Sequence, residues 1–250
     1  MATDGPILGY IRKGLAKGHL HMTLLDPDEQ GPREAAAMAK AAVDAGTDAI
    51  MLGGSTGVDM DKMDTTCMAI KRVAKLPIIL FPTSSGTISK FADAIYFMSM
   101  LNSKDPRYIS REQANAAPVI KTWGLETISM GYIIVEPGMK VGEVGKAEVV
   151  PREREDIAVG YALAAEMFGM SLVYLEAGSG ADKPVPAMMV SMVKKAIGVP
   201  LIVGGGIRTP DAARNAVRAG ADIIVTGTVV EGTKDLGERL SAIIKAVKGG

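Results

Sequence analysis

The chain has 250 residues, a formal net charge of zero from 28 basic and 28 acidic side chains, and 48% hydrophobic residues. This apolar fraction excludes a disordered chain, and the balanced charge excludes a general nucleic-acid binder, which depends on excess cationic charge. One cysteine, Cys67, rules out an internal disulfide, so we expect a buried, unreactive thiol in a cytoplasmic protein. No secretory leader pattern and no run of about 20 apolar residues occurs, so we expect no signal peptide and no membrane span.

Eight short runs rich in isoleucine, leucine and valine are predicted to be strands. They are residues 20–27, 48–54, 77–83, 93–100, 127–136, 171–178, 200–206 and 222–230. Most are apolar throughout, which is typical of a parallel sheet covered on its outer face. Helical patterns over 32–46 and 209–220 both carry a first-turn proline and end in Ala-Gly-x-Asp, as a repeated β/α unit would. We therefore predict an α/β fold, a single TIM (β/α)8 barrel spanning residues 1–250.

Two segments interrupt this regular pattern. Only residues 84–92 separate the third predicted strand from the fourth, which is too short for a full helix. We expect the third helix to be replaced by a short loop. Residues 136–156 are rich in glycine and are predicted to form an extended excursion or a hairpin over the barrel mouth.

Glycines follow the seventh and eighth strands, where barrel enzymes often bind phosphate. The two loops read Gly204-Gly205-Gly206 and Thr226-Gly227-Thr228. Backbone N–H groups can approach an anion closely at glycine, and the next helix adds a favourable dipole. The two loops together predict a phosphate site, and the alternative is a pair of tight turns that bind nothing.

The sixth strand ends in YLEAGSG, residues 174–180, beside the two glycine loops. This segment suits a small phosphorylated polyol, with the glycines and Ser179 near phosphate and Glu176 near the hydroxyls. If its pKa is raised toward the working pH, Glu176 is a candidate general base. The alternative is a carboxylate that only orients the substrate or pairs with a lysine.

A carboxylate and a small polar turn follow the first two strands. Asp26 lies in LLDPDE, and residues 53–57 read GGSTG. A carboxylate here could hold Mg²⁺, which binds through one or two protein oxygens and substrate phosphates. The alternative for Asp26 is a capping role in its own turn.

Aromatic and methionine side chains gather on strands three to five, beside the missing helix. Core packing accounts for most of them, but a groove exposed by the short crossover could also receive a long hydrocarbon chain. The residues concerned are Phe81, Tyr96, Phe97, Met98, Met100, Met130 and Tyr132.

Five motifs in fixed order make the chain similar to a known family. They are LLDPDE at 24–29, GGST at 53–56, YLEAGSG at 174–180, VGGGIRT at 203–209 and TGT at 226–228. On these motifs the chain resembles, over essentially its whole length, the geranylgeranylglyceryl phosphate synthase family of archaeal prenyltransferases, which is related to bacterial heptaprenylglyceryl phosphate synthase. Leu24 stands where some relatives, including bacterial ones, carry lysine, which favours the archaeal branch.

The resemblance implies a Mg²⁺-dependent transfer of the geranylgeranyl group from geranylgeranyl diphosphate to the C3 hydroxyl of sn-glycerol 1-phosphate. This forms the first ether bond of archaeal membrane phospholipids. By the same resemblance Asp26 and Ser55 hold the metal and diphosphate, and Glu176 serves the glycerol hydroxyl. The residues implied to hold glycerol phosphate are Tyr174, Leu175, Glu176, Ala177, Gly178, Ser179, Gly180, Gly204, Gly205, Thr226 and Gly227. A homo-oligomer with transient contact to a membrane surface is also expected.

Two rival functions fit the same barrel. A phosphosugar isomerase or lyase would need an acid/base pair or a Schiff-base lysine at a strand end, and no strand-end lysine stands out. A non-catalytic barrel that binds a phosphate ligand would need neither. His19 and His21, near the start of the first strand, are expected to be structural. Arg208 either reaches phosphate or is an exposed residue at a helix start.

Overall fold

A computed structural model describes residues 4–53, 59–227 and 236–249. Its eight strands pair in parallel in chain order, and β8 pairs with β1, so the sheet closes into a barrel. The strands are β1 (Leu20–Leu25), β2 (Ala49–Leu52), β3 (Ile78–Leu80), β4 (Ala94–Met100), β5 (Glu126–Ile134), β6 (Leu172–Glu176), β7 (Leu201–Gly204) and β8 (Ile223–Thr226). All eight predicted strands are confirmed, most with shorter bounds; residue 54 of the second and residues 228–230 of the last lie outside the described residues.

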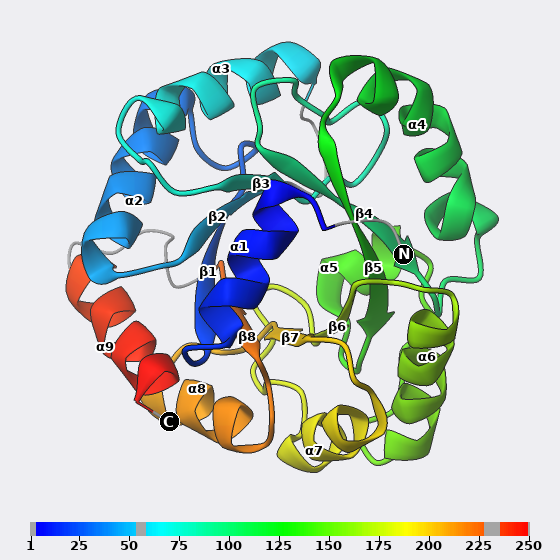
Figure 1. Ribbon diagram of the computed structural model, residues 1–250. Coiled ribbons are helices and arrows are strands. Elements are labelled where there is room, and N and C mark those ends of the chain that lie inside the picture. The colour runs from blue at the N-terminus through cyan, green and yellow to red at the C-terminus, as the bar shows by residue number, and fades with distance from the viewer. Residues whose placement is uncertain (1–3, 54–58, 228–235, 250) are drawn as a thin grey trace.

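Helices surround the barrel, and one of them crosses its end (Figure 1). They are α1 (Pro6–Leu15), α2 (Pro32–Ala45), α3 (Met60–Lys71), α4 (Glu112–Trp123), α5 (Met139–Val144), α6 (Glu155–Met167), α7 (Ala187–Ala196), α8 (Pro210–Arg218) and α9 (Leu236–Lys248), with a single π-helical turn, η1 (Arg107–Arg111), before α4. The helices predicted over 32–46 and 209–220 are α2 and α8, and the side chain of Thr209 caps α8 by accepting from the N–H of Ala212. Within the described part of the chain, no helix is long and apolar enough to cross a membrane.

Strand side chains alternate between two buried layers. One set points into the barrel, where residues such as Met22, Tyr96 and Met130 pack on one another. The other set packs against the surrounding helices in two clusters, one around β5 to β8 and one around β1 to β4. Cys67 lies in the second cluster, where burial raises the pKa of its thiol to about 11, so the expectation of a buried cysteine is confirmed.

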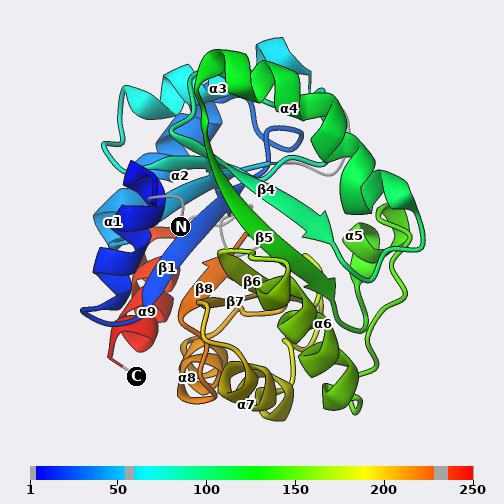
Figure 2. The same ribbon diagram turned by 45° about the vertical axis from the view of Figure 1, so that its right-hand side comes forward.

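The two irregular segments have different outcomes. No helix lies between β3 and β4, which confirms the predicted loop, so α4 comes directly after α3 in the outer ring of helices (Figure 2). The hairpin predicted as one alternative for residues 136–156 is wrong, because the chain instead forms the short helix α5. Gly138 adopts a left-handed conformation at the start of this helix, and its carbonyl accepts from the N–H of Gly142 at 2.9 Å.

Helix α1 closes the barrel at the amino ends of the strands. Its Leu8 and Ile11 are buried with the side chains that fill the interior. Glu126, the first residue of β5, caps the helix across the barrel end, since its carboxylate accepts from the N–H groups of Ile7 and Leu8, both at 2.8 Å. A carboxylate at a helix N-terminus also interacts favourably with the helix dipole.

Replacing Glu126 with alanine should lower the free energy of unfolding by about 1–3 kcal/mol, because two N–H donors lose a charge-assisted partner. Chemical denaturation measures this change. Lys40→Ala is the control, because it removes an exposed ion pair to Asp44 and should cost at most about 0.5 kcal/mol. Equal stability losses in the two variants would contradict the capping role of Glu126.

Candidate active site

Three adjoining cavities open at the carboxyl ends of the strands. The central pocket encloses about 840 Å³ including its open mouth, and its walls include Asp26, Tyr132 and Glu176. Next to it a glycine pocket of about 360 Å³ lies among the ends of β6, β7 and β8. An apolar groove of about 500 Å³ lies on the other side, beside the loop that replaces the missing helix. The central pocket shares part of its wall with each neighbour. It shares with the glycine pocket Leu24, Glu176, Ser179 and Gly227, and with the groove Thr83, Met98, Met100, Tyr108 and Tyr132. The three cavities therefore adjoin, with the central pocket in the middle, and together they make up the hollow of the candidate site.

Two glycines at the end of β7 leave space for the side chains of Tyr174 and Glu176 on β6. A Cβ atom at Gly204 would collide with the hydroxyl of Tyr174, and one at Gly205 would collide with the carboxylate of Glu176. Gly205 also has a φ of 78°, a conformation that favours glycine. The glycine signal in the sequence thus corresponds to a close approach of backbone to the side chains of β6.

Glu176 is a buried carboxylate at the inner edge of this pocket. One of its oxygens accepts from the N–H of Gly178 at 2.7 Å. Burial raises the pKa of Glu176 above its ordinary value, although the nearby hydroxyl of Tyr174 and the N–H of Gly178 act in the opposite direction. A carboxylate with a raised pKa is better suited to accept a proton than an ordinary surface glutamate.

Three aromatic rings form the floor beside Glu176. The ring of Tyr132 lies edge-on to the rings of Phe81 and Tyr174, with centroids 5.3 and 5.2 Å away. Both tyrosines are buried, which raises their pKa values well above the usual range, and the nearby Glu176 charge adds to this. The hydroxyl of Tyr174 lies beside the carboxylate of Glu176 and makes no hydrogen bond to any other described residue, and Tyr174 lines the glycine pocket.

Not all the expected binding residues point toward the hollow. Leu175 and Ala177 are buried in the outer layer between the barrel and its helices, so they can contribute only backbone atoms to the site. Thr226 lines the glycine pocket, but its hydroxyl is bonded to His21, 3.0 Å away. Ser179 reaches both pockets, and Gly178 and Gly180 shape the loop with positive φ values.

Arg208 ties two of the loops together. Its guanidinium donates to the carbonyl of Gly180 and lines the glycine pocket. The residue is largely exposed, yet its charged end lies against the pocket. Both readings of Arg208 from the sequence thus describe part of its position, since it lies at a helix start and borders the cavity.

Asp26 is the candidate metal ligand that the structure describes. It lines the central pocket and is half-buried, and its Oδ1 accepts from the N–H of Asp28 at 2.8 Å. Ser55, the second expected ligand, lies outside the described residues. Among the described residues no group of three His, Cys, Asp or Glu side chains could hold a metal by protein ligands alone. One carboxylate facing an open pocket fits Mg²⁺ that takes its other ligands from water and substrate phosphate.

The apolar groove lies where the third helix of a regular barrel would pack. Its walls include Ile95 and Phe97 on the outer face of β4, and Ala116 and Ile120 on α4. Two of the side chains expected from the sequence to line a groove are absent from its walls, since Met130 belongs to the barrel core and Phe81 lines the central pocket instead. Met98 and Met100 line both cavities, so they lie where the groove meets the central pocket.

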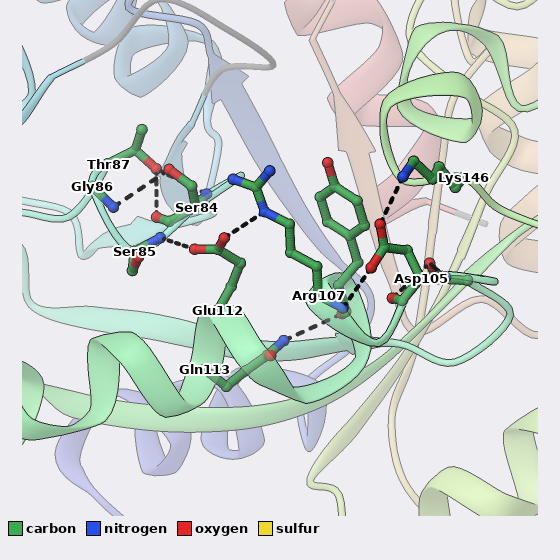
Figure 3. A network of polar contacts seen from close by, with 11 residues as sticks. Ser84, Ser85, Gly86, Thr87, Asp105, Arg107, Glu112, Gln113 and Lys146 are labelled. Carbon is green, nitrogen blue, oxygen red and sulfur yellow. Dashed lines mark hydrogen bonds and ion pairs between the residues drawn. The ribbon is translucent and has the colours of Figure 1, made fainter.

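Polar contacts hold the rim of this groove on both sides (Figure 3). Glu112 accepts from the backbone N–H of Ser85 at 2.7 Å and from Arg107 Nε at 2.6 Å, which joins η1 and α4 to the loop after β3. Asp105 accepts from Lys146 Nζ at 2.8 Å, which joins the other side to the segment after α5. These contacts position Tyr108, which lines both the groove and the central pocket.

Sequence reasoning missed the residues that the irregular segments bring to the site. Val141 and Val144 of α5 and Tyr108 of η1 line the central pocket. Tyr108 does not lie at the end of a predicted strand, where the functional residues of a barrel were expected. The α5 residues could have been found from the prediction that residues 136–156 lie over the barrel mouth, because a segment there must cover part of the pocket.

Comparison with known proteins places the chain in a family. The PcrB family matches residues 13–248. Geranylgeranylglyceryl phosphate synthase from Thermococcus kodakarensis is 51% identical over 248 residues, 98% of each chain. The enzyme of that name from Methanothrix thermoacetophila is 50% identical over 246 residues, 96% of each chain.

A solved structure agrees with these sequence relatives. The crystal structure of (S)-3-O-geranylgeranylglyceryl phosphate synthase from Thermoplasma acidophilum, in complex with its substrate sn-glycerol-1-phosphate, superposes with a TM-score of 0.95. The two chains are 45% identical, and the match covers 100% of each. Fold, sequence and motif order agree, and the chain belongs to the PcrB family, together with the geranylgeranylglyceryl phosphate synthases that it resembles.

Proposed function

We propose that this protein is a Mg²⁺-dependent geranylgeranylglyceryl phosphate synthase, which transfers a geranylgeranyl group from its diphosphate to the C3 hydroxyl of sn-glycerol 1-phosphate. The observation that carries the proposal is the hollow of three adjoining cavities, which runs from the glycine pocket, past Glu176, to the apolar groove. Such a hollow suits one small polar substrate and one long apolar substrate that meet at the centre. Relatives at about half identity carry the name of this enzyme.

The glycine pocket suits sn-glycerol 1-phosphate, which is the ligand of the Thermoplasma acidophilum enzyme. Backbone N–H groups near Gly205, Gly206 and Gly227 would meet the phosphate, and Arg208 adds a positive charge at the edge. The hydroxyl of Tyr174 and the carboxylate of Glu176 would meet the glycerol hydroxyls. The site would thus bind an anion mainly with backbone dipoles.

The central pocket and the groove suit geranylgeranyl diphosphate. Asp26 would hold Mg²⁺ together with oxygens of the diphosphate. When bound, the ion would neutralise charge on the diphosphate leaving group. The hydrocarbon chain would then extend between Met98 and Tyr108 into the groove, where it would cover the apolar side chains Ile95 and Phe97.

In this reaction a bond forms between O3 of glycerol phosphate and C1 of the prenyl group, while the bond from C1 to the diphosphate breaks. Tyr174 and Glu176 would orient the attacking hydroxyl. Glu176 would accept its proton late, since a raised pKa makes the carboxylate a stronger base. Most of the rate enhancement would come from positioning and charge neutralisation.

The pocket walls favour this reaction over a phosphosugar isomerase or lyase. Among the described residues that line the three cavities there is no lysine for a Schiff base. The apolar groove would also have no role with a small sugar phosphate. A non-catalytic barrel would have no need of a buried carboxylate beside the pocket.

Product formation from labelled geranylgeranyl diphosphate and sn-glycerol 1-phosphate tests the proposed function directly. A prenylated glycerol phosphate is expected, and its formation should depend on Mg²⁺. No product with prenyl diphosphates of any chain length would reject the proposal. A homo-oligomer and a cytoplasmic location stay predictions.

Asp26→Asn should abolish turnover without unfolding the protein. The amide oxygen can still accept from the N–H of Asp28, but the metal loses its charged ligand. We expect kcat/KM for geranylgeranyl diphosphate to fall by a factor of about 100 or more and the response to added Mg²⁺ to disappear. Glu29→Gln, at an exposed carboxylate three residues further on, should stay near wild type. Near-normal activity of Asp26→Asn would remove Asp26 from the metal site.

Glu176→Gln should lower kcat by a factor of about 100 or more, because the amide cannot accept the proton. Since the folded-state pKa of Glu176 is raised, wild-type kcat/KM should rise with pH through a pKa above that of an ordinary glutamate. The variant should lack this acid limb. The exposed Glu148→Gln is the matched control. An unchanged acid limb with a loss below tenfold would assign Glu176 to substrate orientation alone.

A further inference from the structure

A polar cluster interrupts the apolar layer between the barrel and its helices. It lies at the seam where β8 pairs with β1, and it consists of His21, Thr23, Thr47 and Thr226, all buried. Elsewhere this outer layer is mostly aliphatic. The ring of His21 lies between two hydroxyls, with Nδ1 3.0 Å from Thr47 Oγ1 and Nε2 3.0 Å from Thr226 Oγ1.

The hydrogen bonds of Thr47 determine which ring nitrogen carries the proton. Thr47 Oγ1 donates to a backbone carbonyl, either that of His21 at 3.1 Å or that of Ala49 at 3.3 Å. It also accepts from Thr23 Oγ1 at 3.1 Å. With its single proton used, Thr47 can only accept from Nδ1–H of the imidazole. The neutral ring then accepts at Nε2, so Thr226 donates its hydroxyl proton to His21.

The surroundings keep this ring neutral. Burial lowers the pKa of His21 to about 3, and the charge of Lys248 acts in the same direction. Lys248 itself donates to Asp48 Oδ1 at 2.9 Å, and the other oxygen of Asp48 accepts from the backbone N–H of His21 at 2.9 Å. At neutral pH the acceptor for Thr226 is therefore always present.

Thr226 connects this cluster to the site. It is the last residue of β8 and lines the glycine pocket together with the next residue, Gly227. Its side chain points to the outer layer, so only its backbone can meet a ligand there. The bond to His21 fixes the side chain of Thr226, and it thereby fixes the direction of the peptide that joins Thr226 to Gly227.

We propose that His21 is a positioning residue for the phosphate of the substrate, and that it acts from outside the barrel through Thr226 on the backbone at the end of β8. The proposal rests on the proposed function for the identity of the substrate, but its physical content is the binding of a phosphate group. Loss of the bond would loosen the peptide and weaken phosphate binding. The apolar groove would be unaffected, because it lies beside β4 and α4, away from the end of β8.

Two pairs of variants separate the bond from the bulk of the side chains. Thr226→Val keeps the shape and removes the hydroxyl, whereas Thr226→Ser keeps the hydroxyl. His21→Asn places an amide near the position of Nδ1 and loses the contact with Thr226, whereas His21→Gln reaches the position of Nε2. We expect Thr226→Val and His21→Asn to raise KM for sn-glycerol 1-phosphate about three- to tenfold, with kcat and KM for geranylgeranyl diphosphate within about twofold. Thr226→Ser and His21→Gln can keep the hydrogen bond, so their KM for sn-glycerol 1-phosphate should stay near the wild-type value.

The double variant that combines His21→Asn with Thr226→Val should lose no more than either single change, since both remove the same bond. Ser129→Ala is the control, because it removes a hydroxyl pair with Ser171, 3.1 Å apart, on the strand opposite β1 in the barrel. A purely structural role would lower the thermal unfolding midpoint of all these variants without separating the two KM values.

Binding of inorganic phosphate, measured by calorimetry on the same proteins, tests the role of His21 independently of activity. Weaker phosphate binding by Thr226→Val than by wild type is expected. Equal phosphate affinity, or an equal rise in both KM values, would overturn the role of His21. Absence of product with the wild-type protein would instead reject the proposed function. The role of His21 would then be decided by the phosphate affinities of the wild-type protein and the variants.

Discussion

The alternation of side chains along eight short parallel strands is the constraint on which the rest of the structure depends. One set of side chains fills the barrel, and the other packs against the helices. At the carboxyl ends the inward set is no longer covered by a further layer, so its last members face an open mouth. Leu24, Phe81, Tyr132 and Glu176 occupy such positions. The candidate site is therefore the uppermost layer of the core, and it shares the close packing and rigidity of that core.

Much of the fold could be predicted because local signals and chain length agree. Apolar runs marked the strands, and the nine residues 84–92 were too few for a helix. Helix α5 could not be predicted, because six residues with an internal glycine do not form a stable helix in isolation. Its conformation depends on tertiary contacts, such as the packing of Val149 near Gly138 and Ile134, which sequence pattern does not reveal.

The direction of individual side chains was harder to predict than the position of the site. Strand β6 is buried on both faces, so its sequence does not show whether Glu176 or its neighbours point inward. Once Glu176 is known to face the pocket, the period of two sends Leu175 and Ala177 to the outer layer. The same rule explains Thr226, which lies at the end of β8 as predicted and directs its hydroxyl to His21 in the outer layer. Motifs locate a segment at the mouth, but they do not separate backbone from side-chain contributions.

Zero net charge has a consequence for how such a site must work. Among the described residues lining the glycine pocket, Arg208 is the only one with a full positive charge, and it already donates to Gly180. An anion there would depend on peptide dipoles, which attract it only when their N–H groups point at it. Side chains that fix the backbone then influence binding without touching the ligand. His21 would act in this way through its bond to Thr226, and Glu176, besides meeting the substrate, holds the N–H of Gly178. In a pocket without excess charge, the hydrogen bonds that hold the loops therefore determine where the N–H dipoles of those loops point.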